Sequence, residues 1–200
     1  IDQLRLLPDE PETVLLHKCA RLLRVEPSAL TGLTVLRRAI DARESLTFVY
    51  TVIVSAPQET ALLRRCRDKR VTAYAPEQYV LPASVDAPAV RPIVVGAGPA
   101  GLFAALVLAK CGARPILLER GQCVEQRQRD VQRFWATGEL DTESNVQFGE
   151  GGAGAFSDGK LNTGTRDVRH RFIMEQLVSC GAPANILTDA LPHVGTDMLH

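Results

Sequence analysis

Hydrophobic and polar positions in residues 1–82 follow strand-like and helix-like spacing in turn. Residues 46–54 (LTFVYTVIV) are apolar, aromatic or β-branched throughout, which is typical of a strand. After Pro11, apolar side chains recur every three or four positions, which predicts a helix as far as Leu23. The same criteria predict strands at 4–7, 33–40, 46–54 and 71–79, and helices at 11–23 and 58–67. This βαββαβ order predicts a ferredoxin-like α/β domain, a fold that hosts too many activities to indicate one.

Residues 92–119 show a different order, in which two nearly continuous apolar strands flank one helix. We expect the strands at 92–95 and 114–119, and a helix between them that begins at Pro99 and ends at Cys111. Strands that are apolar on both faces are typical of a parallel sheet covered on both sides, which predicts the start of a Rossmann-type domain. Further along we expect a helix at 124–137, an irregular Gly-rich stretch at 144–165, a helix at 168–180, and short strands or loops at 182–200.

A break in the periodicity separates these two regions. Residues 81–91 (LPASVDAPAVR) contain Pro82, Pro88, small residues and no apolar repeat, which is typical of a linker. We therefore expect a ferredoxin-like domain at 1–82, a linker at 83–91 and a truncated Rossmann-type domain at 92–200. Because the chain starts without Met and ends without a tail-like signal, we expect it to be a piece of a longer protein.

Composition narrows the possible partners. Lys+Arg and Asp+Glu balance at 23 each, so net charge gives no case for a nucleic-acid or anionic-membrane partner. The basic run at 64–70 is interpreted as a solvated helix face, and no nucleic acid is expected. No apolar run reaches the roughly 18 residues of a membrane span. The five cysteines are scattered without metal or dithiol spacing, which indicates a reducing cytoplasm and no metal site.

The motif GAGPAG at 96–101 follows a strand directly and opens a helix. In such a turn Gly96 permits the tight bend, Gly98 lets the backbone approach a pyrophosphate, and Gly101 lets helix and strand pack together. Glu119 ends the second strand, where a carboxylate accepts hydrogen bonds from ribose hydroxyls and repels a 2′-phosphate. The pattern predicts a dinucleotide without a 2′-phosphate, against the alternative of a purely structural turn. The predicted contact residues in this motif are Gly96, Ala97, Gly98, Pro99, Ala100 and Gly101.

A second group of glycines crowds residues 145–163 (NVQFGEGGAGAFSDGKLNT). Successive glycines allow backbone N–H groups to converge on an anion or to pass close to a flat ring. Ser157 and Asp158 supply side-chain hydrogen bonds, and Lys160 supplies a positive charge of the kind that stabilises a reduced flavin near its N1/C2 region. The alternative interpretation is a flexible, solvent-exposed loop.

Several stretches together resemble one family. VVGAGPAG resembles the first dinucleotide fingerprint of flavoproteins of the glutathione-reductase type. The stretches ERGQCVEQRQRDVQRFW, SNVQFGEGGAGAFSDGKLNT, LPHVGTD and DARESLTFVYTV resemble the bacterial family of uncharacterised FAD-dependent dehydrogenases. The resemblance implies an FAD-binding domain preceded by a small α/β domain. Because such flavoproteins run well past 200 residues, it also implies that this chain holds only the AMP-pyrophosphate half of the FAD site.

The resemblance also implies roles for individual residues. Gly96, Gly98, Gly101 and Glu119 would contact the pyrophosphate and ribose of FAD. Arg120 and Arg127 would supply positive charge to it. Gly151, Gly152, Ser157 and Lys160 would lie near the pyrophosphate or the flavin. His193, in LPHVGTD, is either a proton shuttle near the flavin or a turn residue packed beside Pro192.

These observations predict an FAD-dependent oxidoreductase that transfers a hydride between the flavin and an unidentified small-molecule substrate. NAD(P)H is a possible electron donor in the longer protein. Lys160 and His193 are the only candidates for a catalytic role. For this chain alone we expect weak or absent FAD retention and no activity. The alternative is a dinucleotide-binding or regulatory module without turnover, whose N-terminal domain binds RNA or a protein.

Overall fold

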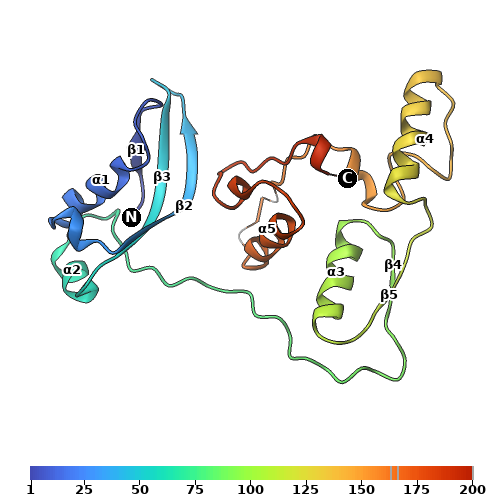
Figure 1. Cartoon of the computed structure of the whole chain (residues 1–200), viewed down its shortest axis with the longest axis horizontal. Helices are drawn as coiled ribbons and strands as arrows, with labels where there is room; N and C mark the ends of the chain where they lie inside the picture. The colour runs from blue at the N-terminus through green and yellow to red at the C-terminus, as the bar shows by residue number, and fades with distance from the viewer. Residues whose placement is uncertain (163, 166, 200) are drawn as a thin grey trace. The chain divides into compact units, whose positions relative to one another are not determined.

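The computed structural model describes residues 1–162, 164–165 and 167–199, which divide into two compact units (Figure 1). The N-terminal unit contains residues 1–77 together with 183–192. The glycine-rich unit contains residues 78–182 together with the residues from 193 onward. Each unit is described by itself below. Among the described residues, no helix has the length and apolar character that crossing a membrane requires.

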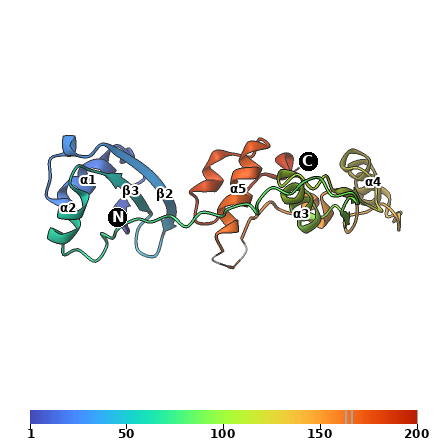
Figure 2. The ribbon, with the colours of Figure 1, turned by 90° about the horizontal axis from the view of Figure 1, so that it is seen from below.

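The N-terminal unit is a three-stranded antiparallel sheet with two helices on one of its faces (Figure 1, Figure 2). Its strand order is β1-β3-β2, and a register shift interrupts the β2–β3 pairing between Val35 and Arg37. A buried core lies between α1 and the sheet, where Leu15 and Cys19 meet Leu6 and Val52. The elements are β1 (Leu4–Leu6), α1 (Val14–Leu23), β2 (Gly32–Asp41), β3 (Thr47–Ser55) and α2 (Glu59–Arg65), with a 3-10 turn, η1, at Pro27–Ala29.

The predicted last strand at 71–79 is wrong. The N–H of Asp2 donates to the Arg70 carbonyl (3.0 Å), but no strand follows in residues 71–79. Pro76 has no N–H to donate, and Ala73 and Ala75 are weak strand formers that bury little here. The ferredoxin-like arrangement needs this fourth strand, so it is not confirmed.

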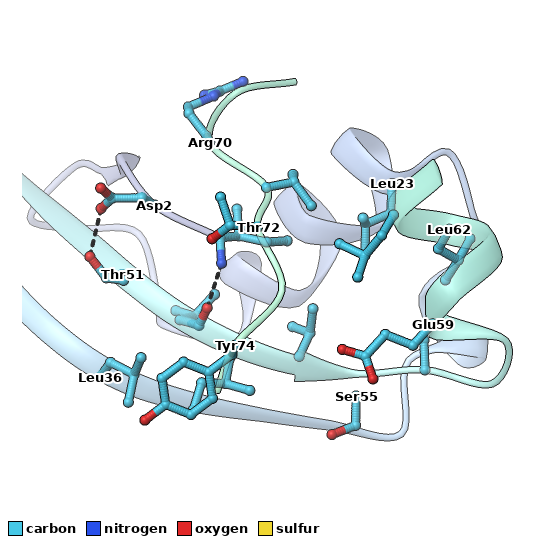
Figure 3. Close-up of a pocket in the computed structure, with 17 residues that line it drawn as sticks. Asp2, Leu23, Leu36, Thr51, Ser55, Glu59, Leu62, Arg70, Thr72 and Tyr74 are labelled. Atoms are coloured by element: carbon cyan, nitrogen blue, oxygen red, sulfur yellow. Dashed lines mark hydrogen bonds between the residues drawn. The ribbon is translucent and has the colours of Figure 1, made fainter. Parts of the chain in front are cut away.

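Val71, Thr72 and Tyr74 instead line a cavity of about 400 Å³ beside β3 and α2 (Figure 3). Its floor is aliphatic, with Leu23 and Leu62 facing it, and its rim is polar. At the rim, the hydroxyl of Thr51 donates to the carboxylate of Asp2 (2.6 Å). None of the predicted cofactor-binding residues lines this cavity.

Residues after helix α5 (Arg169–Ser179) return to the open edge of β2. The N–H of Arg38 donates to the Thr188 carbonyl (2.7 Å), and the N–H of Ala190 donates to the Arg38 carbonyl (2.8 Å). The guanidinium of Arg38 also pairs with the carboxylate of Asp189 at 2.8 Å. Residues 188–190 therefore protect the backbone of an edge strand, which otherwise presents unpaired groups. The periodicity of residues 182–200 does not predict this return, and the predicted domain boundaries stay predictions.

The glycine-rich unit contains a two-stranded parallel sheet, as the apolar pattern of 92–119 predicts. Ile93 pairs with Ile116 and Val95 with Leu118. The observed strands span three residues each, shorter than predicted, whereas the observed helices start and end close to the predicted residues. The elements are β4 (Ile93–Val95), α3 (Pro99–Lys110), β5 (Ile116–Leu118), α4 (Val124–Thr137) and α5 (Arg169–Ser179). After α4 the described residues also form the 3-10 turns η2 (Gly152–Phe156), η3 (Ala184–Leu187, in the N-terminal unit) and η4 (Thr196–Met198).

The parallel strands are exposed. Ile93 is 61% and Val95 is 81% exposed, and the apolar helix α3 has no buried residue. The sequence predicts strands covered on both faces, and the described residues do not supply that cover.

Candidate functional site

The glycine turn joins β4 to the N-terminus of α3, as predicted. Gly96 has a φ of +96°, which favours glycine, and its N–H donates to the Leu118 carbonyl (2.7 Å). A Cβ on Gly101 would lie 1.8 Å from the Gly96 carbonyl oxygen, so only glycine lets helix and turn approach this closely. Gly98 is the N-cap of α3 and Pro99 its first residue. No side chain among the described residues caps this helix, so its first N–H groups remain available to a ligand.

Glu119 lies directly after β5 and faces this turn. One carboxylate oxygen accepts the N–H of Ala97 (2.6 Å), and the other accepts the N–H of Gly121 (2.8 Å). The Ala97 N–H and then the Gly121 N–H lower the pKa of Glu119 below its ordinary value, which keeps it ionised. The N–H groups of Arg120 and Gly149 also lower this pKa, so backbone donors surround the carboxylate, and its expected contact with a ribose stays a prediction.

The second glycine group packs directly on the first. The N–H of Gly151 donates to the Ala97 carbonyl (2.8 Å). A Cβ on Gly152 would lie 3.1 Å from the Cα of Gly98 and 3.2 Å from the Cδ of Pro99. The structure therefore brings together two motifs separated by about fifty positions, and residues 151–152 form one wall of the glycine turn.

Arg127 holds this second motif in place. Its side chain is completely buried in α4, and its guanidinium donates to four backbone carbonyls of one loop. These belong to Asn145 (3.1 Å), Val146 (3.1 Å), Gly152 (3.0 Å) and Glu150. Burial lowers the pKa of Arg127, and the nearby charges of Glu119 and Glu150 oppose that effect. All three guanidinium nitrogens are occupied, so Arg127 acts on the loop, and its expected contact with FAD stays a prediction.

Arg127 also supports an aromatic ring, because its guanidinium lies 4.8 Å from the centre of the Phe156 ring. Arg120 lies elsewhere on the loop. It is exposed, with its guanidinium 4.6 Å from the centre of the Phe148 ring and 3.9 Å from Glu143. Its expected role as positive charge for FAD also stays a prediction.

A second buried polar contact holds this loop, and the sequence does not predict it. Asp130 is buried in α4 and accepts the hydroxyl of Ser144 (2.6 Å) and the amide of Gln126 (3.0 Å). A single acidic residue in a polar helix gives no sequence signal for such a role. Close approach of two backbones is indicated in the sequence only by the number of glycines. In the structure, a Cβ on Gly121 would lie 2.5 Å from the Cα of Gly149.

The two candidate catalytic residues lie together. Lys160 and His193 pair across an isolated antiparallel bridge, and the N–H of Val194 donates to the Gly159 carbonyl (2.9 Å). Asp158 contacts both, since its carboxylate pairs with the Lys160 ammonium (2.7 Å) and its carbonyl lies 2.6 Å from Nε2 of His193. This contact lowers the pKa of Asp158 and raises that of Lys160, so both groups are charged. Nearby, the exposed Ser157 accepts the N–H of Gly159 (3.2 Å).

Within the described residues, no three His, Cys, Asp or Glu side chains gather to hold a metal ion, and all five cysteines are free.

Comparison with known proteins agrees with this geometry. Residues 91–170 match the model of a family described as "FAD binding domain", and residues 1–55 match a "Domain of unknown function (DUF8436)". An uncharacterized protein of Clostridium beijerinckii is 42% identical over 202 residues, which cover 100% of this chain and 38% of that protein. The chain thus spans about two fifths of the length of this relative.

The match over 91–170 supports the predicted FAD cofactor. It covers the glycine turn, Glu119, Arg127 and the second glycine group. NAD(P)H as donor and a cytoplasmic location stay predictions.

Proposed function

We propose that this chain holds the adenosine and pyrophosphate part of FAD in a flavin-dependent oxidoreductase of the glutathione-reductase type. The observation that carries the proposal is the uncapped N-terminus of α3, with Gly98 at its N-cap and the ionised Glu119 beside it. Such a helix end offers N–H groups and a positive dipole to a pyrophosphate. The carboxylate of Glu119 accepts hydrogen bonds from the adenosine ribose and disfavours a 2′-phosphate.

The residues present fit the cofactor. A Cβ on Gly98 would have only the Cα of Gly152 nearby, at 4.0 Å. The backbone of Gly98 therefore borders open space, from which a phosphate would approach. Gly96, Gly101, Gly151 and Gly152 keep side chains away from this space. Bound FAD supplies the redox chemistry, namely hydride exchange with a small-molecule substrate of unknown identity.

Lys160 and His193 contribute polar and charged groups to the site. The ammonium of Lys160 is fixed by Asp158, and it supplies positive charge on the second glycine loop. His193 places its ring nitrogen Nε2 2.6 Å from the carbonyl oxygen of Asp158.

A methyl group at Gly98 tests the proposal, because the ligand-free structure tolerates it. The φ of Gly98 is −74°, and a Cβ there meets no atom closer than 4.0 Å, so Gly98→Ala should fold normally. The same methyl group intrudes where the pyrophosphate lies. We expect at least tenfold weaker binding of FAD and of ADP, measured by isothermal titration calorimetry.

Gly32→Ala is the matched control, because a Cβ at Gly32 meets no atom within 4 Å and the residue lies in β2. It should bind ADP as the unsubstituted chain does. Equal ADP affinity in Gly98→Ala, or no binding of ADP to the unsubstituted chain, would overturn the proposal.

A further inference from the structure

One large aromatic side chain in the glycine-rich unit is not explained by packing. Trp135, the single tryptophan of the chain, is 67% exposed. The buried face of α4 is formed by Arg127, Asp130 and Val131, and Trp135 lies off that face. It continues a stripe with Gln128 and Gln132, at intervals of four and three positions along the helix. Exposed tryptophans are enriched where proteins bind partners or ligands, so this stripe invites a binding role.

The stripe forms one wall of a cavity of about 370 Å³, which we call the Trp135 cavity. The opposite wall is Ala155 and Phe156 of η2, followed by Ser157, and Asp197 completes the lining. The position of Phe156 in this wall is held by Arg127, whose buried guanidinium lies 4.8 Å from the centre of the Phe156 ring. The cavity therefore has two aromatic groups, one of them fixed by the same arginine that holds the second glycine loop.

The polar groups of the cavity offer both donors and acceptors. Neither Gln128, Gln132 nor Asp197 uses its side chain in a hydrogen bond or ion pair with another residue that the structure describes. Each carboxamide presents N–H donors and a carbonyl acceptor, and the carboxylate accepts only. An indole face surrounded by such groups matches a flat ring with hydrogen-bonding groups on its edge. A purely apolar ligand would leave these groups unpaired, and a flexible polar ligand would not use the indole.

We propose that the Trp135 cavity binds a planar nitrogen heterocycle, stacked on Trp135 and hydrogen-bonded at its edge by Gln128, Gln132 and Asp197. This proposal rests on the proposed function, since it places a ring next to the loop that carries Ser157 and Lys160. Two molecules can bring such a ring: FAD itself, through its isoalloxazine, or a separate nicotinamide-like substrate.

Titration calorimetry on the 200-residue chain with three probes tests the proposal. Riboflavin carries the isoalloxazine without the adenylate, reduced nicotinamide mononucleotide carries the other ring, and ADP reports the glycine turn. We expect riboflavin or the nicotinamide probe to bind, and Trp135→Ala to weaken that binding at least tenfold. Trp135→Phe, which keeps a ring for stacking, should stay within about threefold of the unsubstituted chain. Binding of riboflavin alone assigns the cavity to the flavin, and binding of the nicotinamide probe alone assigns it to a substrate.

Two controls separate this proposal from the proposed function. Arg129→Ala, an exposed change on α4 outside the cavity, should leave all three affinities unchanged. ADP binding should be lost in Gly98→Ala and retained in Trp135→Ala. If ADP binds in this manner but neither ring binds, or if Trp135→Ala binds the ring as tightly as before, the cavity proposal is overturned and the proposed function stands.

Discussion

Leu15 of the N-terminal unit and Arg127 of the glycine-rich unit are both completely buried, but for opposite physical reasons. Leu15 packs among aliphatic side chains from α1, β1 and β3, where removal of apolar surface from water stabilises the fold. Arg127 is buried among backbone carbonyls, and its hydrogen bonds compensate for the lost hydration of its charge.

The two units as a whole differ in the same way as these two residues. The N-terminal unit buries a continuous aliphatic core, whereas in the glycine-rich unit the strand residues Ile93 and Val95 are exposed. The glycine turn and the loop around it are therefore held mainly by polar contacts to backbone carbonyls and by close packing of glycines. Apolar burial contributes little to this site. Removal of a buried charge should therefore lower the stability of the glycine-rich unit most. Removal of side-chain volume should lower the stability of the N-terminal unit most.

The largest expected effect comes from Arg127→Met, which keeps an unbranched apolar side chain but lacks the guanidinium. Four loop carbonyls lose their partner at once, and we expect the loop to be destabilised by about 3–5 kcal/mol, because each buried acceptor left without a donor costs about 1–3 kcal/mol. Hydrogen exchange measured by mass spectrometry should rise at least a hundredfold in residues 145–152. Exchange in residues 14–23 should not change. Arg129→Met, on the exposed side of α4, is the control. Unchanged exchange in the loop would show that Arg127 does not hold it.

The converse change is Leu15→Ala, which leaves a cavity in the aliphatic core. A completely buried leucine of this kind contributes about 3 kcal/mol relative to alanine. We expect the N-terminal unit to unfold at lower denaturant concentration, while ADP binding at the folded glycine turn is retained. Leu16→Ala, at a half-buried position next to it, should cost less. A loss of ADP binding equal to the loss of stability would contradict the independence of the two units.

A smaller effect is expected from pH. The folded pKa of Glu119 lies below its ordinary value of 4.5, because the Ala97 N–H stabilises the ionised form. The contribution of Glu119 to the free energy of unfolding is therefore fully present above about pH 4.5. It is lost as the pH falls through the folded pKa. We expect a loss of roughly 1 kcal/mol in the glycine-rich unit on acidification, since solvent screens this half-exposed group. Denaturant unfolding at pH 7 and at pH 3 measures it. Glu119→Gln should lack this component, and an identical pH dependence in the variant would rule it out.

Local signals in the sequence predicted much of this structure. The helix at 124–137 was expected with the observed bounds from the spacing of its apolar residues. In the structure Gly138 ends this helix in a left-handed conformation. The helix at Pro99 was expected because glycine and proline fix its start. The strand at 71–79 failed because Val71 and two tyrosines suggested a strand, while Pro76 and two alanines prevented pairing and burial.

Other features of the site carried no local signal. The acceptors of Arg127 are backbone carbonyls, which every sequence provides, so nothing in residues 145–152 marks them as its partners. The proximity of Lys160 and His193 depends on a backbone bridge between distant segments. The glycines indicated that backbones approach closely but not which ones, and Gly152 against Gly98 could be learned only from the fold.

The pairing of residues 188–190 with β2 has a consequence for biosynthesis. Arg38 and Asp189 are 151 positions apart, so this contact closes one of the longest loops in the chain. At about 5–20 residues per second, a ribosome needs roughly 8 to 30 s to synthesise the residues between them. During that interval all residues of the N-terminal core have been synthesised, whereas the segment that pairs with the edge of β2 has not. Covering that edge is therefore a late step, completed only after the glycine turn and α5 have left the ribosome.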